Sequence, residues 1–216
     1  MSSSTLPPPP PPPSTSQPLT LAAAASFLAE KARSTSQLIE KTLLPPPSHK
    51  PTDFSNPYPS NPSLTRLSNL SAKLLQFNQH ANTLGDCLTS AGAGGGVADE
   101  LASTLDKALT RCDQGVEVVS GQLKWLGRDD VGTDVLQGTA TGKGKTQKEV
   151  DGQVVEEYAD LLIAYSRLFI FGSQIVILDK NEQAEWMAKA DVDKMINKAE
   201  ESAKKVLLGK SILRQL

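Results

Sequence analysis

The sequence predicts an all-α protein, a bundle of four or five helices preceded by a disordered proline-rich arm. Apolar residues recur at spacings of three and four along several segments, which is typical of amphipathic helices. Clusters of proline or glycine separate these segments and mark the ends of the helices. The chain has 216 residues, and with a disordered front end this leaves the foldable length of about one domain.

Residues 1–18 form the arm, which contains seven consecutive prolines, Pro7 to Pro13. Proline fixes φ near the polyproline II value and lacks an N–H, so we expect a stiff, extended segment. Such a segment suits SH3, WW, EVH1 or profilin grooves, with Pro7, Pro10 and Pro13 as the candidate docking residues. The alternative is a spacer without a partner, since no Arg or Lys flanks the prolines.

Residues 19–44 are predicted to be the first helix, and residues 45–62 an irregular linker rich in Pro, Ser and Asn. The helix ends where three prolines begin at Pro45. Its apolar residues follow spacings of three, four and their multiples: Leu21, Leu28, Ala32, Ile39 and Leu43.

Residues 63–216 are predicted to be the helical bundle, which begins with a clear start signal. Asn61 is a candidate N-cap, and Pro62 occupies the first helical position, where a missing N–H costs nothing. A coiled-coil-like spacing of 3-4-3-4-3-4 then places Ala81 and six large residues on one narrow seam. These six are the candidate helix-packing interface, with the bundle or with a partner: Leu67, Leu70, Leu74, Phe77, Leu84 and Leu88.

A third helix is predicted from Val97 to Leu126, after the break AGAGGG. It ends at Gly127, as a C-cap glycine would suggest, and a flexible loop is expected over 127–148. Gly115 and Gly121 lie inside this helix, and each costs up to about 1 kcal/mol relative to Ala. We expect both to be tolerated rather than required for close packing.

The stretch LLIAYSRLFIFGSQIVIL, residues 161–178, carries one charge and is nearly long enough to cross a membrane. Acidic flanks without a Lys or Arg cluster favour the central helix of a bundle over a membrane element, which is kept as the alternative. Asp160, Arg167 and Gln174 form a thin polar stripe at spacings of seven. We expect Arg167 to extend to the surface or to pair with an acid. Replacement of Ile170 by Lys should unfold or aggregate the protein if the stretch is a core helix, and should leave it folded if the stretch is a membrane element.

A last helix is predicted from about Asn181 to Leu208, with Gly209 interrupting it before the final residues. Its stripe of small and apolar side chains comprises Ala188, Val192, Met195, Ala199, Ala203 and Val206.

Charge and cysteine content narrow the class of protein. Lys and Arg number 22 against 24 Asp and Glu, so no global field favours nucleic acid as a partner. Cys87 and Cys112 lie on apolar helical faces and are expected to be buried thiols. Because the N-terminal stretch lacks a basic region and a cleavage context, a cytoplasmic location is expected.

No catalytic, cofactor or metal site is predicted, and we expect a protein that is not an enzyme. The loop GTATGKGKT has one residue too many between Gly138 and Gly144 for a phosphate-binding loop. A calcium loop starting at Asp179 would have Ala184 and Ala190 where Gly and Glu are required. An enzyme that uses the GKGKT loop remains only as a hypothesis to be tested.

The segments ALTRCDQGVEVVSGQLKWL, GKGKT and VVEEYADLLIAYSRLFIFGSQI loosely resemble the HeLo-like N-terminal domains of fungal STAND proteins. The resemblance covers residues 101 to 177, with Cys112 as its distinctive residue. It implies a helical bundle that self-associates and, in some relatives, attacks membranes in programmed cell death.

The sequence therefore predicts a non-catalytic helical interaction or scaffold protein that acts through helix packing on a protein partner or a second copy of itself. The alternative is the membrane-active or self-associating domain linked to fungal cell death signalling that the resemblance implies. A scaffold requires an apolar stripe that stays exposed on an outer helix, whereas membrane activity requires the helix over 161–178 to leave the bundle.

Overall fold

Helices make up most of the chain in the computed structural model, which describes residues 16–44, 61–94, 96–127, 148–209 and 211–215. The predicted all-α class is confirmed. The elements are α1 (Ser16–Leu38), the π-helical turn η1 (Ile39–Leu43), α2 (Pro62–Gly94), α3 (Asp99–Leu126), β1 (Lys148–Val150), α5 (Gly152–Ile175), α6 (Lys180–Met187), α7 (Ala190–Leu207) and β2 (Leu213–Gln215).

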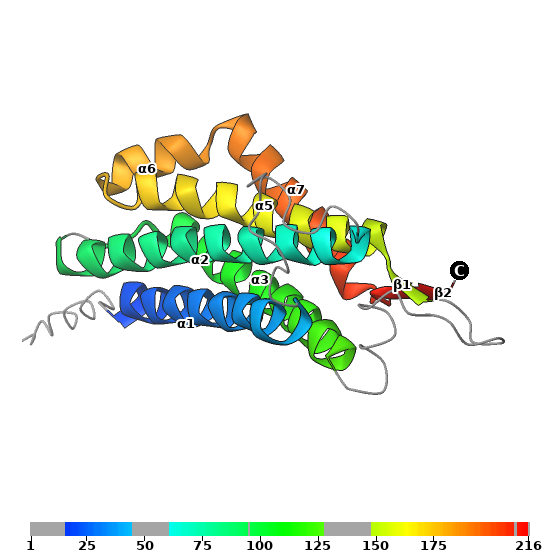
Figure 1. Ribbon diagram of the computed structural model, residues 1–216. Coiled ribbons are helices and arrows are strands. Elements are labelled where there is room, and N and C mark those ends of the chain that lie inside the picture. Colours follow the sequence, from blue (N-terminus) through cyan, green and yellow to red (C-terminus); the bar gives the residue numbers. More distant parts are fainter. Residues whose placement is uncertain (1–15, 45–60, 95, 128–147, 210, 216) are drawn as a thin grey trace, which may run out of the picture.

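In the described part of the chain, five long helices close a ring around one apolar core (Figure 1). α1 packs on α2 and α3, α2 packs on α5, and α7 completes the ring between α5 and α3. The core includes the rings of Phe77, Tyr165 and Phe169. The Phe169 centroid lies 5.6 Å from that of Phe77 and 6.1 Å from that of Tyr165, so aromatic packing joins α2 to α5.

The helices α2 and α5 are neighbours that run in the same direction (Figure 1). At their starts, a Cβ atom at Gly152 would lie 2.8 Å from the Arg66 guanidinium carbon, and further along one at Gly172 would lie 3.4 Å from Leu84 Cδ1. Parallel neighbours need a long return connection, and α3 supplies it by running back along the bundle.

The start of α2 and its apolar seam agree with the sequence. Asn61 Oδ1 accepts a hydrogen bond from the N–H of Leu64 at 3.1 Å, and Pro62 is the first helical residue. The six large seam residues and Ala81 are all buried in the core of the bundle. The seam is therefore the surface that α2 turns toward the other helices.

The first helix belongs to the bundle rather than standing apart from residues 63–216. It begins at Ser16 instead of residue 19 and ends in the π-helical turn η1, which the sequence does not signal. Ala25, Ala29 and Ala32 are buried, and these small side chains let α1 approach α2 closely. A Cβ atom at Gly85 of α2 would lie only 3.1 Å from Oγ of Ser26.

The predicted last helix over 181–208 is wrong in one respect, because the structure divides it into α6 and α7. The buried Gln183 fixes α6 across the end of the bundle. Its Nε2 donates to the carbonyl of Leu178 at 2.8 Å, and its Oε1 accepts from the N–H of Ala98 at 2.7 Å. Since α7 must then run back along α5 and α3, the backbone turns at Lys189, where φ is −78° and ψ is 133°.

A two-stranded antiparallel ribbon of β1 and β2 covers the other end of the bundle and was not predicted (Figure 1). The carbonyl of Val150 accepts from Nη1 of Arg66 at 2.9 Å, and the N–H of Asp151 donates to the carbonyl of Ile212 at 2.8 Å. Gly209 has φ of 72° and follows the end of α7, so the predicted interruption there is confirmed.

The two glycines inside α3 differ, and the expectation of simple tolerance holds for only one of them. A Cβ atom at Gly121 would meet nothing within 4 Å, whereas one at Gly115 would press on the side chain of Leu161 in α5. Gly115 therefore permits the close approach of α3 to α5.

Candidate interaction surface

The outer side of α5 carries Ile163 and Ile170, and Ile177 follows at the same spacing of seven in the turn just after the helix. These three residues are here called the isoleucine row. Ile163 is half-buried, and the exposed fractions of Ile170 and Ile177 are 37% and 66%. Ile170 is therefore a surface position of α5 and not a core position. The helix is flanked by α2 on one side and α7 on the other, which leaves a strip of its circumference uncovered.

The predicted polar stripe of Asp160, Arg167 and Gln174 lies beside the isoleucine row, and all three side chains are exposed. Seven residues are close to two helical turns, so the polar stripe keeps one orientation along α5, and so do Ile163 and Ile170. Among the residues that the structure describes, Arg167 has no ion-pair partner, so of the two expectations for this residue the pairing with an acid is not found there.

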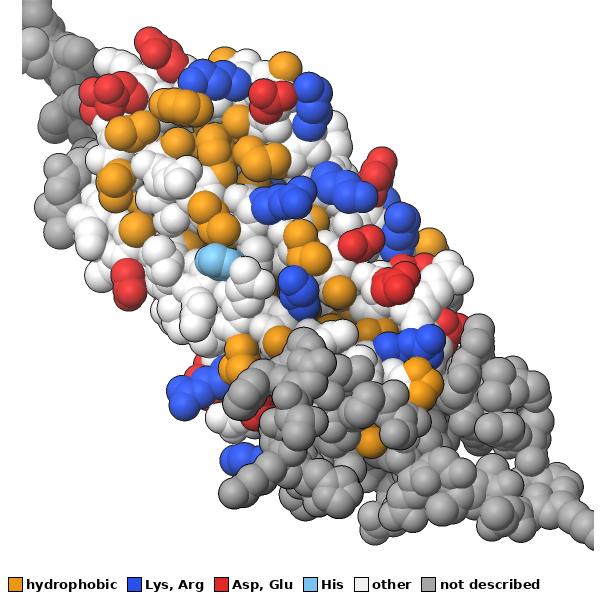
Figure 2. Space-filling view, turned by 45° about the horizontal axis from the view of Figure 1, so that its top comes forward, with side chains coloured by type: hydrophobic (Ala, Val, Ile, Leu, Met, Phe, Trp, Pro, Cys, Tyr) orange, Lys and Arg blue, Asp and Glu red, His pale blue; other side chains and the backbone are white. Residues whose placement is uncertain are grey.

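Two aromatic residues form a second apolar contact, between α5 and α6. The rings of Phe171 and Trp186 meet edge to face with centroids 6.4 Å apart, and Trp186 is 42% exposed. Nζ of Lys189 lies 2.9 Å from the Trp186 ring centroid, a cation–π contact. We call Ile163, Ile170, Phe171, Ile177 and Trp186 the α5–α6 surface, and Figure 2 shows hydrophobic side chains gathered on this side of the molecule.

The position of α6 follows from its N-terminal cap. Oδ1 of Asp179 accepts from the N–H groups of Asn181 at 2.9 Å and Glu182 at 3.0 Å. Asp179, where the calcium-like sequence begins, is thus the N-cap of α6. Together with the buried Gln183, this cap fixes the helix that carries Trp186.

A hollow of about 480 Å³ lies where the isoleucine row ends. Its walls come from the end of α2 and from the turn between α5 and α6. They comprise Ser90, Ala91, Gly96, Val176, Ile177, Leu178, Asp179 and Lys180. The hollow is large enough to receive a side chain of a partner.

Along α2, Arg66, Lys73, His80 and Cys87 recur at spacings of seven and are all half-buried. Because Arg66 contacts the residues just before and at the start of α5, this row faces the α5 side of α2. The isoleucine row is therefore bordered by half-buried α2 side chains on one side and by the polar stripe on the other.

The predicted interface residues lie elsewhere. Leu67, Leu70, Leu74, Phe77, Leu84 and Leu88 are buried within the chain, so in this conformation they pack against the bundle and not against a partner. Pro7, Pro10 and Pro13 lie outside the described residues.

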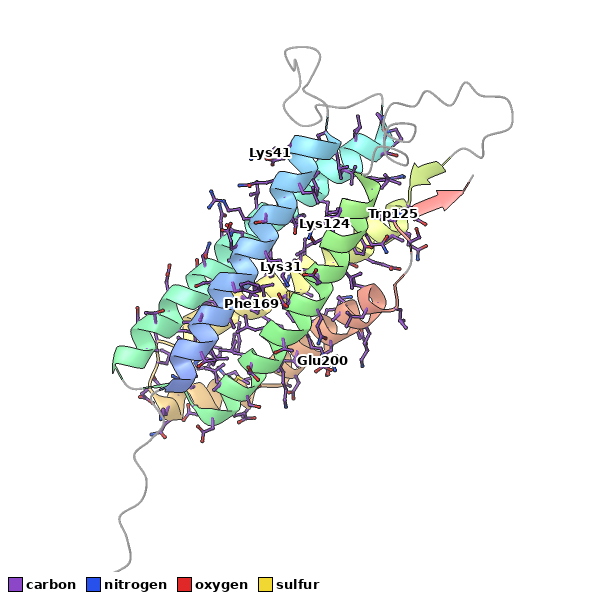
Figure 3. All side chains as sticks on the ribbon, turned by 90° about the horizontal axis from the view of Figure 1, so that it is seen from below. Lys31, Lys41, Lys124, Trp125, Phe169 and Glu200 are labelled. Carbon is purple, nitrogen blue, oxygen red and sulfur yellow. The ribbon has the colours of Figure 1, made fainter. Side chains whose placement is uncertain are left out.

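A small cavity of about 140 Å³ opens between α3, α5 and α7. Lys107, Arg111 and Glu200 contribute charged side chains to it, and the buried Tyr165 reaches it from α5. Burial raises the pKa of Tyr165, which keeps its hydroxyl protonated at neutral pH. Figure 3 shows Glu200 on the α7 side of this region.

Both cysteines are free thiols. Cys112 is buried as predicted, whereas Cys87 is only half-buried. Burial raises the pKa of each, with a smaller contribution from the neighbouring Asp113 or Asp86. A raised thiol pKa disfavours the reactive thiolate at neutral pH. The two cysteines are best explained as packing residues.

The described ranges contain neither a candidate metal site nor a candidate membrane span. No cluster of three or more His, Cys, Asp or Glu side chains suited to hold a metal ion is present among those residues. In the same part of the chain, no helix combines the length and the apolarity that a membrane crossing needs.

Sequence reasoning found the polar stripe but missed the apolar surface beside it. Periodicity assigned residues 161–178 to one helix without telling which isoleucines face outward, because nearly all positions there are apolar. The repeat of isoleucine at spacings of seven, in phase with the polar stripe, was the available signal. Nothing in the sequence indicated that Trp186 would come next to Phe171, because that contact depends on the turn after α5.

No family model, curated protein or solved structure matches this chain.

Proposed function

We propose that the protein is a non-catalytic cytoplasmic interaction module, and that its α5–α6 surface binds a protein partner. The observation that carries the proposal is that Ile170 on α5, Ile177 in the turn after it and Trp186 on α6 all stay exposed in the folded bundle. Large contiguous apolar patches are unusual on a monomeric protein without a binding role. Aromatic residues and an aliphatic centre with a polar border are typical of interfaces that contain energetic hot spots.

The experiment compares tagged wild-type protein with two variants in a pull-down from its own cells. Ile170→Lys places a charge in the centre of the α5–α6 surface. Leu75→Lys is the matched control, since Leu75 on α2 is 39% exposed and lies outside that surface. A protein retained by wild type and by Leu75→Lys, but not by Ile170→Lys, is then purified and titrated against all three forms.

A purified partner that binds Ile170→Lys at least tenfold more weakly than the other two forms supports the proposal. The same set of retained proteins with all three forms contradicts it. The proline arm adds a second contact to the proposal, through Pro7, Pro10 and Pro13, and serine at these three positions tests that contact separately.

A membrane-contacting or self-associating role, as the HeLo-like resemblance implies, is a second candidate. The combination of Trp186, Phe171 and a nearby lysine favours it, since aromatic and basic side chains suit the interface of a bilayer. Flotation with anionic liposomes is the test. Flotation of wild type and Leu75→Lys, but not of Ile170→Lys, would replace the first candidate by the second.

A further inference from the structure

We propose that the isoleucine row receives an amphipathic helix of a partner protein whose apolar stripe is flanked by acidic side chains. This inference rests on the proposed function and specifies the shape and charge of the partner. The spacing of the isoleucine row, the hollow at its end and the charges on both of its sides support this partner.

The spacing of the row matches a helix. Ile163 and Ile170 lie about 10.5 Å apart along the axis of α5, and an amphipathic helix presents apolar residues at the same interval. A helix laid along α5 would thus contact Ile163 and Ile170 in turn and reach Ile177 in the turn beyond them. The hollow beside Ile177 provides space for a large side chain at the end of that stripe, as helix-in-groove recognition requires.

The charges beside the row favour acidic flanks on the partner. Arg167 lies in the exposed polar stripe, and Lys73 lies in the α2 row on the other side of the isoleucines. The register between α2 and α5 places Lys73 near the level of Ile163. Neither cation has an ion-pair partner among the described residues. Acids border the two ends of the row, Asp160 at the first and Asp179 at the hollow, so the middle is the positively charged part.

Two other occupants fit these observations less well. A second copy docked about a two-fold axis would bring the same surface, with its own Arg167, against this one, and like charges would meet. A polyproline segment needs a free aromatic face, but Lys189 lies over the exposed ring of Trp186. A partner helix needs only the isoleucine row for its apolar stripe and the hollow for one large side chain.

The test uses two designed helical peptides of three heptads each, labelled for fluorescence anisotropy. Both carry Leu at the first and fourth positions of every heptad; one has Glu and the other Lys at the flanking positions. We expect the Glu peptide to bind wild type about fivefold more tightly than the Lys peptide, from two exposed charge pairs. Ile170→Lys should weaken both peptides.

Replacing the two cations by acids should reverse the preference for the Glu peptide over the Lys peptide. Lys73→Glu combined with Arg167→Glu is expected to bind the Lys peptide more tightly. The control, Lys198→Glu combined with Lys205→Glu, changes the net charge equally on exposed positions of α7 and should keep the wild-type preference. Circular dichroism of each variant establishes that the bundle is folded.

Several outcomes would overturn the inference: no binding of either peptide to wild type, equal binding of both, or a control that reverses the preference like the test pair. Concentration-dependent dimerisation of wild type that Ile170→Lys abolishes would assign the surface to a second copy instead. If a natural partner is lost in Ile170→Lys while the peptides show no charge preference, the proposed function stands and this inference falls.

Discussion

A Cβ atom on Gly115 would lie 2.7 Å from Cδ2 of Leu161, so α3 and α5 meet at a point where no methyl group fits. Leu161 is fully buried and has little freedom to move away. The first prediction follows from this contact. Gly115→Ala should lower the free energy of unfolding by about 1 to 2 kcal/mol, because overpacking of a core outweighs the gain in helix propensity.

Gly121→Ala is the matched control for that prediction. The same substitution in the same helix meets open space, and it should raise the free energy of unfolding by up to about 1 kcal/mol. Urea unfolding of both variants, followed by circular dichroism, gives the comparison. Stabilisation by both substitutions would show that α3 and α5 do not approach as described.

The second prediction concerns an ion-pair cluster between α1 and α3. Nζ of Lys31 lies 2.5 Å from Oδ1 of Asp113 and 3.0 Å from Oε2 of Glu117, and Figure 3 shows Lys31 between the two helices. Lys31 is half-buried, with 18% of its side chain exposed, whereas the side chains of Asp113 and Glu117 are 37% and 62% exposed. We expect Lys31→Met to lower the free energy of unfolding by about 1 kcal/mol at neutral pH.

The pH dependence of the same variant provides an independent check. The hydrogen bond from Lys31 lowers the pKa of Glu117 below its ordinary value of 4.5. A lowered carboxyl pKa stabilises the fold above that ordinary value, and the contribution is lost as pH falls through the folded-state pKa. Wild type should therefore lose stability more steeply than Lys31→Met below about pH 4.5. Identical slopes would contradict the role of Lys31.

The same cluster is expected to weaken at high pH. Burial by itself lowers the pKa of Lys31, but the hydrogen bonds to Asp113 and Glu117 outweigh it and the pKa is raised above 10.5. A raised lysine pKa stabilises the fold below the ordinary value and ceases to do so as pH rises through the folded-state pKa. The contribution of Lys31 is therefore complete at neutral pH.

The third prediction concerns Tyr158, whose buried hydroxyl has no hydrogen-bond partner among the residues that the structure describes. An unsatisfied buried hydroxyl costs roughly 1 to 3 kcal/mol, so Tyr158→Phe should raise the free energy of unfolding by about 1 kcal/mol or more. Burial, and secondarily Glu157, raises the pKa of Tyr158 from 10.0 to about 12. Wild type should accordingly lose stability as pH rises from 10 to 12, because only the unfolded chain ionises readily there.

Thermal unfolding across pH 7 to 12 checks both parts of that prediction. Tyr158→Phe should show a higher midpoint at pH 7 and a shallower decline above pH 10. Some decline remains, because the pKa of the buried Tyr165 is also raised. A lower midpoint for Tyr158→Phe at pH 7 would mean that the hydroxyl has a partner in solution.

The sequence alone was enough to predict the elements that depend on local signals. The seam from Leu67 to Leu88, the N-cap at Asn61 and the interruption at Gly209 depend on neighbours in the chain, and the structure has all three. The break at Lys189 could not be predicted, because it depends on hydrogen bonds of Gln183 to residues as distant as Ala98. The ribbon likewise pairs residues more than sixty positions apart.

The last prediction separates the two faces of α5 by means of adjacent residues. Phe169 is fully buried against Phe77, whereas Ile170 is 37% exposed. Phe169→Ala should lower the free energy of unfolding by about 3 to 5 kcal/mol through the cavity it leaves. Ile170→Lys should lower it by about 1 kcal/mol or less, since lysine can extend its ammonium into water. Urea unfolding measures both, and an unfolded Ile170→Lys variant would contradict the surface position of Ile170. A folded variant is also what makes Ile170→Lys usable as a probe of binding, because any partner it loses is then lost through the surface and not through the fold.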